Sequence, residues 1–128
     1  KKVVSKDITN AIGVSVGYTA LNLDLHTIVT YTELGKTARL ISKYRPNASI
    51  LAVTPSAKVA RGLSLVWGVD AQISEQAKST DEMLLTAARI AKSSGYAKVG
   101  DAIVITGGIN TSVSNAGTTN FLKVSVID

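Results

Sequence analysis

Residues 27–39, TIVTYTELGKTAR, decide the fold of this chain. Thr27-Ile28-Val29 is typical of the start of a short buried strand, and Gly35 then marks a tight turn. Beyond the turn, apolar residues recur at helical spacing at Ala38, Leu40, Ile41 and Tyr44. The stretch therefore predicts a strand, a glycine turn and the N-terminus of a helix.

The turn around Gly35 has the chemistry of an anion site. A helix N-terminus presents unpaired N–H groups and the positive end of the helix dipole. Lys36 would add a positive charge, and Thr32 and Thr37 would add hydroxyl groups. The spacing G-x-x-x-x-G-K-[ST] of a P-loop is missing. The residues alone leave two interpretations open, a phosphate site or an ordinary connection between a strand and a helix.

Outward from this stretch, helical and strand patterns alternate. We expect helices that begin near Asp7, after Gly35, at Thr54-Pro55 and at Ser79, with Thr54 as the N-cap of the third and Ser79 and Glu82 as a capping box in the fourth. Further strands are expected at residues 50–53, 69–73 and 102–106. In the last strand Leu122, Val124 and Val126 alternate with polar residues, which favours an antiparallel edge strand with one wet face.

This alternation predicts an α/β fold. We expect a three-layer α/β/α domain with a five-stranded, mostly parallel sheet of order 3-2-1-4-5, in which the last strand is antiparallel. Ligands of such sheets bind beyond the carboxyl ends of the strands, where the strand order reverses. That crevice would lie between the first and fourth strands. The loops that follow these two strands, residues 32–37 and 107–120, are therefore the expected ligand site.

Composition bounds the class of protein. The chain has 128 residues, enough for one domain, with 45% apolar and 18% charged residues. It contains no Cys, which excludes disulfides and thiolate metal sites, and no apolar run of membrane-spanning length or signal-peptide pattern. We therefore expect no membrane partner, and the absence of Cys is compatible with a cytoplasmic protein.

The formal charge of +5 is concentrated in one region. Residues 34–69 contain six basic and no acidic residues: Lys36, Arg39, Lys43, Arg45, Lys58 and Arg61. Neither a recognised basic helix nor an aromatic stacking platform accompanies them, so we expect no nucleic-acid partner. The excess is typical of a solvated face, and a positive field around a small anionic ligand explains the same residues.

The sequence offers no catalytic or metal-binding constellation. His26 is the only His, the nine carboxylates are scattered, and no G-x-G-x-x-G follows a strand. Gly13 and Gly17 are unusual for a different reason, because each is unfavourable inside a helix. Their shared face predicts a close backbone neighbour, which is either another subunit or the chain's own sheet.

Several segments, in order and at matching spacing, resemble the C-terminal domain of bacterial pyruvate kinases. They are GKTA at 35–38, KYRP at 43–46, ILAVT at 50–54, LVWGV at 65–69, STDE at 79–82, GD at 100–101 and TTN at 118–120. The likeness extends from about Ile8 to Ile127. It implies that residues 1–128 are a single α/β domain, a fragment of a longer chain whose catalytic (β/α)₈ barrel is absent, and the missing initiator Met agrees with this expectation.

The resemblance also implies a function. The parent enzyme would pass phosphate from phosphoenolpyruvate to ADP, using Mg²⁺ and K⁺ held in the barrel, as a cytosolic homotetramer. This chain would be its regulatory and subunit-contact domain, with no catalytic residue, metal site or cofactor of its own. Its partners would be the catalytic barrel, other subunits and a phosphorylated effector, either a sugar phosphate or AMP.

The resemblance places the effector phosphate on two loops. The implied binding residues are Thr32, Glu33, Leu34, Gly35, Lys36 and Thr37 in the first, with Gly117 and Thr118 in a second loop that closes over the ligand. Two features depart from the family's pattern, since Leu34 stands where many members have a hydroxyl and the second loop, residues 108–117, lacks the usual Pro and Gly pattern. Glu33 also adds a negative charge beside the expected anion. Two alternatives therefore remain, a purely structural or oligomerisation domain without effector and a stand-alone α/β module that binds small anions.

Overall fold

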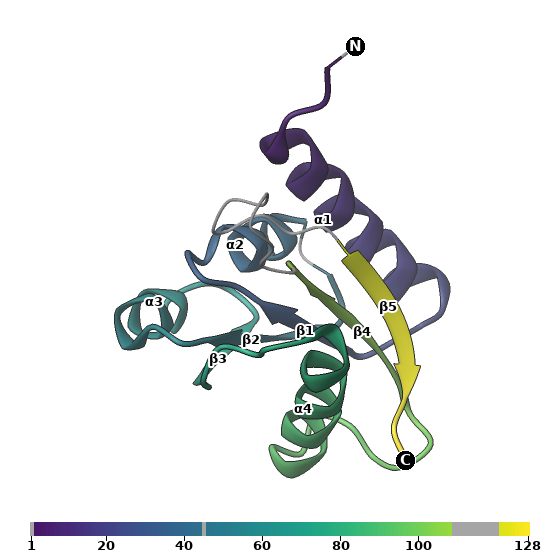
Figure 1. Ribbon diagram of the computed structural model, residues 1–128. Coiled ribbons are helices and arrows are strands. Elements are labelled where there is room, and N and C mark those ends of the chain that lie inside the picture. The colour runs from purple at the N-terminus through teal and green to yellow at the C-terminus, as the bar shows by residue number, and fades with distance from the viewer. Residues whose placement is uncertain (1, 45, 109–120) are drawn as a thin grey trace.

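The strands form one sheet in the computed structural model, which describes residues 2–44, 46–108 and 121–128 (Figure 1). The strands are β1 (Thr27–Tyr31), β2 (Ser49–Thr54), β3 (Val69–Ile73), β4 (Ala102–Gly107) and β5 (Phe121–Val126). In the described residues their order is β3-β2-β1-β4-β5. The first four strands are parallel, and β5 is antiparallel to β4. The expected strand order and directions are confirmed.

Helices cover both faces of the sheet and complete the three layers. The described helices are α1 (Ser5–Asn22), α2 (Lys36–Lys43), α3 (Ala57–Leu63) and α4 (Thr80–Ser93). Buried residues of α1, α2 and α3 pack on one face, against Ile28, Ile50 and Ala52 among others. Helix α4 packs alone on the opposite face in the described part of the chain (Figure 1).

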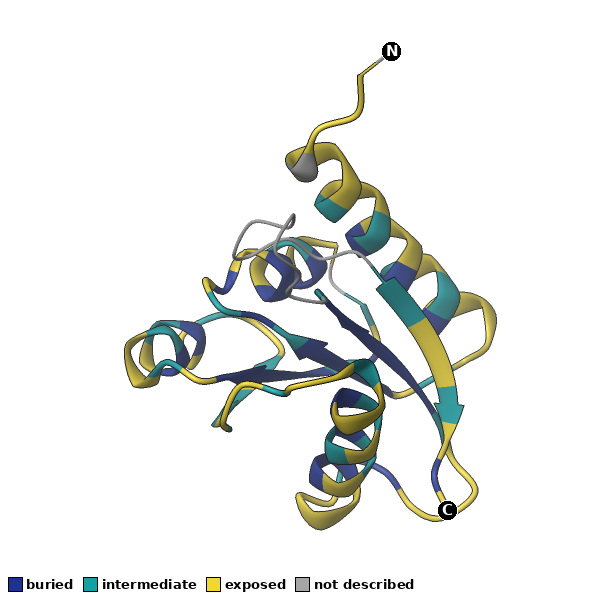
Figure 2. Cartoon of the chain, viewed as in Figure 1, coloured by how far each residue is buried: buried dark blue, intermediate teal, exposed yellow. Residues whose placement is uncertain are grey.

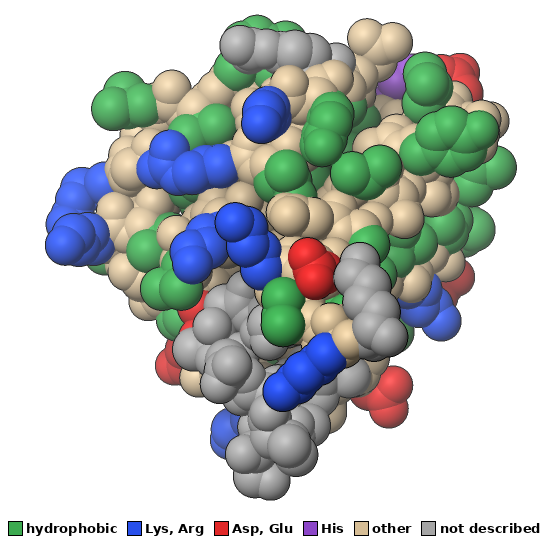
Figure 3. All heavy atoms as spheres, turned by 90° about the horizontal axis from the view of Figure 1, so that it is seen from above, with side chains coloured by type: hydrophobic (Ala, Val, Ile, Leu, Met, Phe, Trp, Pro, Cys, Tyr) green, Lys and Arg blue, Asp and Glu red, His purple; other side chains and the backbone are tan. Residues whose placement is uncertain are grey.

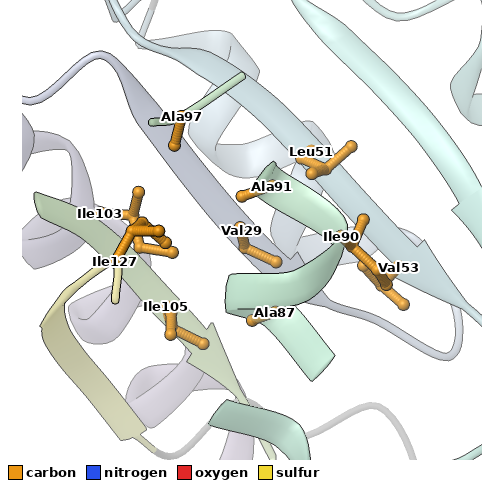
Figure 4. Close-up of a cluster of buried hydrophobic side chains, with 10 residues drawn as sticks. All are labelled: Val29, Leu51, Val53, Ala87, Ile90, Ala91, Ala97, Ile103, Ile105 and Ile127. Carbon is orange, nitrogen blue, oxygen red and sulfur yellow. The ribbon is translucent and has the colours of Figure 1, made fainter. Parts of the chain in front are cut away.

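The core lies where these layers meet, and Figure 2 shows it as a buried band along the central strands. On the α4 side, Ala87, Ile90 and Ala91 face apolar side chains of β1, β2 and β4 (Figure 4). The central strands read as continuous apolar runs because both of their faces are covered. Thr30 of β1 is also fully buried, at 0% exposure.

Gly13 has its close neighbour within the chain. A Cβ atom at Gly13 would lie 2.5 Å from Leu40 Cδ2 of α2, whereas no atom of the described residues lies within 4 Å of a Cβ at Gly17. The glycine at 13 therefore lets α1 and α2 approach each other. This finding favours packing within the chain for Gly13, against a helix and not against the sheet, and it leaves Gly17 without such a neighbour among the described residues.

The expected N-cap at Thr54 is wrong. Thr54 stays in β2, where its carbonyl accepts the Ser74 N–H at 3.0 Å, so the chain cannot turn into a helix at that residue. Ser56 caps α3 instead, and its Oγ accepts the Val59 N–H at 3.2 Å. The Thr54 hydroxyl accepts the Ser56 N–H at 3.2 Å, which holds the short link between strand and helix.

The exposure of side chains in strand β5 differs from what its alternating sequence pattern predicts. Its apolar positions were expected to face the core, but Val124 is 37% exposed and Val126 is 60% exposed. Leu122 alone of the three packs against the cluster beneath α1. The apolar face of this edge strand is therefore only partly covered.

Among the helices in the described part of the chain, none combines the length and the apolar composition that a membrane span requires.

Candidate functional site

The candidate site is the turn between β1 and α2. Thr32 extends β1 by one bond, since its N–H donates to Val53 O at 2.9 Å. Gly35 then adopts a left-handed conformation, with φ of 87°, and caps α2 without a side-chain hydrogen bond. A Cβ at Gly35 would lie 3.3 Å from Leu63 Cδ2 of α3. Both the dihedral angle and the close approach of α3 therefore favour glycine at this position.

The hydroxyl and amide groups of the turn are partly used within it. Thr32 Oγ1 accepts the Gly35 N–H at 2.7 Å, and the Thr32 side chain is only 9% exposed. An anion that took the Gly35 N–H would therefore have to replace this bond. The first intrahelical bond of α2 joins the Arg39 N–H to Gly35 O at 3.1 Å. The preceding N–H groups, at residues 36–38, precede the first possible intrahelical bond, as at any helix start.

The side chains of the turn differ in charge, polarity and exposure. Lys36 is exposed, whereas Thr37 is buried, at 1% exposure. Glu33 accepts a hydrogen bond from Gln76 Nε2 at 3.1 Å, which ties the turn to the segment between β3 and α4. Leu34 is 52% exposed and offers an apolar surface. Gln76 was missed by sequence reasoning, because nothing in the local pattern places residue 76 beside residue 33.

The neighbouring strand ends meet as expected at the switch in strand order. Thr30 of β1 is in register with Thr106 of β4, so the loops after these two strands start side by side. A Cβ at Gly107 would lie only 3.0 Å from Tyr31 Cβ. The Tyr31 hydroxyl donates to Met83 O at 3.0 Å, and burial raises the pKa of Tyr31 to about 12. The second expected loop, including Gly117 and Thr118, lies outside the described residues.

The surface around α2 and α3 is positively charged. Figure 3, which looks onto the side of the molecule that carries α1, α2 and α3, shows most of its Lys and Arg side chains on the half with α2 and α3. Lys36, Arg39 and Lys43 come from α2, and Lys58 and Arg61 from α3. A cationic surface beside a helix N-terminus attracts anions from solution. Hydrophobic side chains gather on the other half, over α1.

The described residues hold no group of three or more His, Cys, Asp or Glu side chains that could bind a metal ion. A groove that the sequence did not predict, with a volume of about 310 Å³, lies between α1 and the link from α2 to β2. Its walls include Val14, Tyr18, Leu21, Tyr44 and Pro46. It lies beside residues that precede β1 and β2 and is therefore at the opposite strand ends from the candidate turn.

The fold and this turn define a class of protein, a doubly wound α/β domain with a helix N-terminus at its topological switch point. The family model "Pyruvate kinase, alpha/beta domain" matches residues 10–125, and the chain belongs to that family. A pyruvate kinase of Bacillus licheniformis is 54% identical over 126 residues, and one of Staphylococcus epidermidis is 48% identical over 126 residues. Each alignment covers 98% of this chain, which spans 21% of the length of either relative.

A comparison with solved structures supports the same family relationship. The crystal structure of a pyruvate kinase from Cryptosporidium parvum superposes with a TM-score of 0.82 at 30% identity. The match covers all of this chain and 24% of that chain. A second structure of the Cryptosporidium parvum enzyme, in complex with ADP, superposes with a TM-score of 0.83. The resemblance to the pyruvate kinase α/β domain is confirmed by family, relatives and fold.

Proposed function

We propose that this chain is the regulatory and subunit-contact domain of a pyruvate kinase and binds a phosphorylated effector at residues 32–37. The observation that carries the proposal is the N-terminus of α2, opened by Gly35 at the switch point and flanked by the cations of α2. Backbone N–H groups and a helix dipole at one point favour a phosphate group. A sugar phosphate or AMP supplies that group.

The parent protein, by the same proposal, transfers phosphate from phosphoenolpyruvate to ADP in the cytoplasm. This assignment rests on the relatives, of which the chain spans 21%. The catalytic residues, Mg²⁺ and K⁺ would belong to the barrel, and the chain alone would have no phosphotransferase activity. A coupled assay that detects pyruvate formation by the 128-residue chain would contradict this last point.

Subunit contact is proposed on the outer face of α1. Residues 8–23 carry no charged side chain. Three apolar residues at helical spacing are exposed on this helix, Val14 at 48%, Tyr18 at 65% and Leu21 at 69%. A helix that is apolar on both sides is normally covered on both. The exposed Val124 and Val126 of β5 add apolar surface on the same side of the domain.

Calorimetric titration with glucose 6-phosphate and AMP tests effector binding, and three variants test the site. Lys36→Ala should weaken binding by about tenfold, an effect that shrinks as salt is raised, because exposed charges are screened.

Thr37→Val should weaken binding to a similar extent with little salt dependence, provided that its melting temperature shows it is folded. Leu34→Ser should strengthen binding because it adds a hydroxyl to the turn. Unchanged affinity in all three variants would refute the site.

A purely structural domain is the second candidate function. It is favoured by the turn itself, because Leu34 exposes an apolar side chain and the Gly35 N–H is already bonded to Thr32 Oγ1. No heat of binding for either ligand at millimolar concentration would support this alternative.

A further inference from the structure

Strand β3 forms an open edge of the sheet. Within the described residues only β2 pairs with it. The Ile50 N–H donates to Gly68 O at 2.9 Å and the Ser74 N–H to Thr54 O at 3.0 Å, so the even-numbered residues of this segment turn their peptide groups toward β2. Successive peptide groups of a strand point to opposite sides, and those of Ala71 and Ile73 therefore point outward. An outward row of N–H and C=O groups is a template for another strand.

A hollow of about 500 Å³ lies beside this edge, between α3 and β3. Ala57, Ala60, Arg61 and Ser64 form its helical wall, and residues 71–73 form the strand wall. The side chain of Ile73 is 61% exposed. A strand added to β3 would therefore place alternate side chains over the hollow, where an apolar group gains contact.

The charge beside the edge decides what kind of strand fits it. Arg61 is exposed at the hollow, Lys58 lies one turn earlier on α3, and residues 34–69 contain no acidic residue. Asp70 lies on the other face of β3, where its Oδ2 accepts the Tyr96 hydroxyl at 2.8 Å. Pairing of two β3 edges would bring the cations of two α3 helices together, which disfavours a second copy of the chain.

We propose that the β3 edge binds an extended acidic segment of a partner protein by strand addition. The segment pairs with the peptide groups of Ala71 and Ile73. It sets an apolar side chain in the hollow and a carboxylate beside Arg61, two residues along the strand. No residue of the turn at 32–37 lines this hollow, so the docking site is separate from the proposed effector site.

The test is an NMR titration of the ¹⁵N-labelled chain with a capped seven-residue peptide. Glutamate, valine and glutamate occupy the second, fourth and sixth positions, with serine and threonine elsewhere. Saturable shifts are expected at the amides of β3 and α3. Ala71→Pro should weaken binding by about tenfold or more, because it removes an outward N–H that proline can lack on an edge strand. Ile73→Pro is the second variant, should Ala71→Pro fail to fold.

Charge variants and a control peptide complete the test. Arg61→Glu should weaken binding by about fivefold, and Lys58→Glu, which does not line the hollow, by less. A peptide with lysine in place of glutamate should cause no saturable shift. The proposal is overturned if the acidic peptide shifts no β3 amide at millimolar concentration, or if it binds a folded proline variant equally well. Dimerisation of the chain that Ala71→Pro abolishes would also overturn it, in favour of a second copy.

Discussion

Thr27 and Thr30 are two buried threonines of β1 whose hydroxyl groups have different surroundings. Thr27 Oγ1 donates to Tyr96 O at 2.6 Å and so fixes the segment after α4 to the strand. Thr30 Oγ1 has no hydrogen-bond partner in the described part of the chain, although the side chain is 0% exposed. A buried hydroxyl without a partner is costly, since it has lost its bonds to water.

The substitution Thr30→Val should therefore stabilise the domain, by about 1 kcal/mol, because it replaces the hydroxyl with a methyl group of similar volume. The matched control is Thr27→Val, which leaves the Tyr96 carbonyl without its donor and should cost about 1–3 kcal/mol. Urea unfolding of the three proteins measures both effects. A loss of stability in Thr30→Val equal to that in Thr27→Val would show that the Thr30 hydroxyl has a partner.

At the scale of elements, α1 and α2 approach each other closely at Gly13, whereas the described part of the chain leaves open space beside Gly17 in the same helix. Both glycines cost the helix backbone entropy. Only at Gly13 is this entropy cost offset by packing, because Leu40 of α2 occupies the volume of the absent side chain.

Gly17→Ala should stabilise the domain by about 0.5–1 kcal/mol, the usual difference between alanine and glycine inside a helix. Gly13→Ala should give a smaller gain or none, because Leu40 has to shift, and Gly13→Leu should be clearly destabilising. Thermal unfolding monitored by circular dichroism distinguishes these outcomes. Equal gains from alanine at both positions would contradict the assigned helix contact.

The elements themselves follow largely from local patterns. The run Ile50-Leu51-Ala52-Val53 and the Ser79 cap, whose Oγ accepts the Glu82 N–H at 3.1 Å, lie where periodicity and capping chemistry predict them. The third helix start was wrong because Thr54 and Ser56 are equally good caps locally, and pairing of β2 with β3 decides between them. Tertiary contacts between distant residues, such as Gln76 with Glu33, leave no local signal. The turn was found because a glycine between a strand and a helix is a local feature.

At the scale of the whole molecule, the face seen in Figure 3 has a cationic half and an apolar half. The half with α2 and α3 carries most of the cations in Figure 3, and the half with α1 carries apolar side chains. A contiguous exposed apolar surface on a domain indicates a contact with another protein surface. The uncharged face of α1 is therefore the proposed site of subunit contact. The positively charged half, with α2 and α3, contains the proposed anion site.

The double variant Tyr18→Lys/Leu21→Lys should lower self-association of the chain, because it places charge on that apolar face. Leu65→Lys is the control, since Leu65 is 90% exposed but follows α3, away from α1. Sedimentation velocity over a range of concentrations measures the effect. If the unsubstituted chain and the double variant have the same association behaviour, the α1 face does not mediate contact between copies of this chain.

The central claim is that a phosphorylated effector binds at the N-terminus of α2, and NMR titration with AMP and glucose 6-phosphate tests it most directly. We predict saturable shifts of the Gly35, Lys36 and Thr37 amides, with a large change at Gly35 because its bond to Thr32 Oγ1 is replaced. The amides of β3 should remain unchanged. Saturable shifts confined to other parts of the domain, or none at millimolar ligand, would contradict the claim.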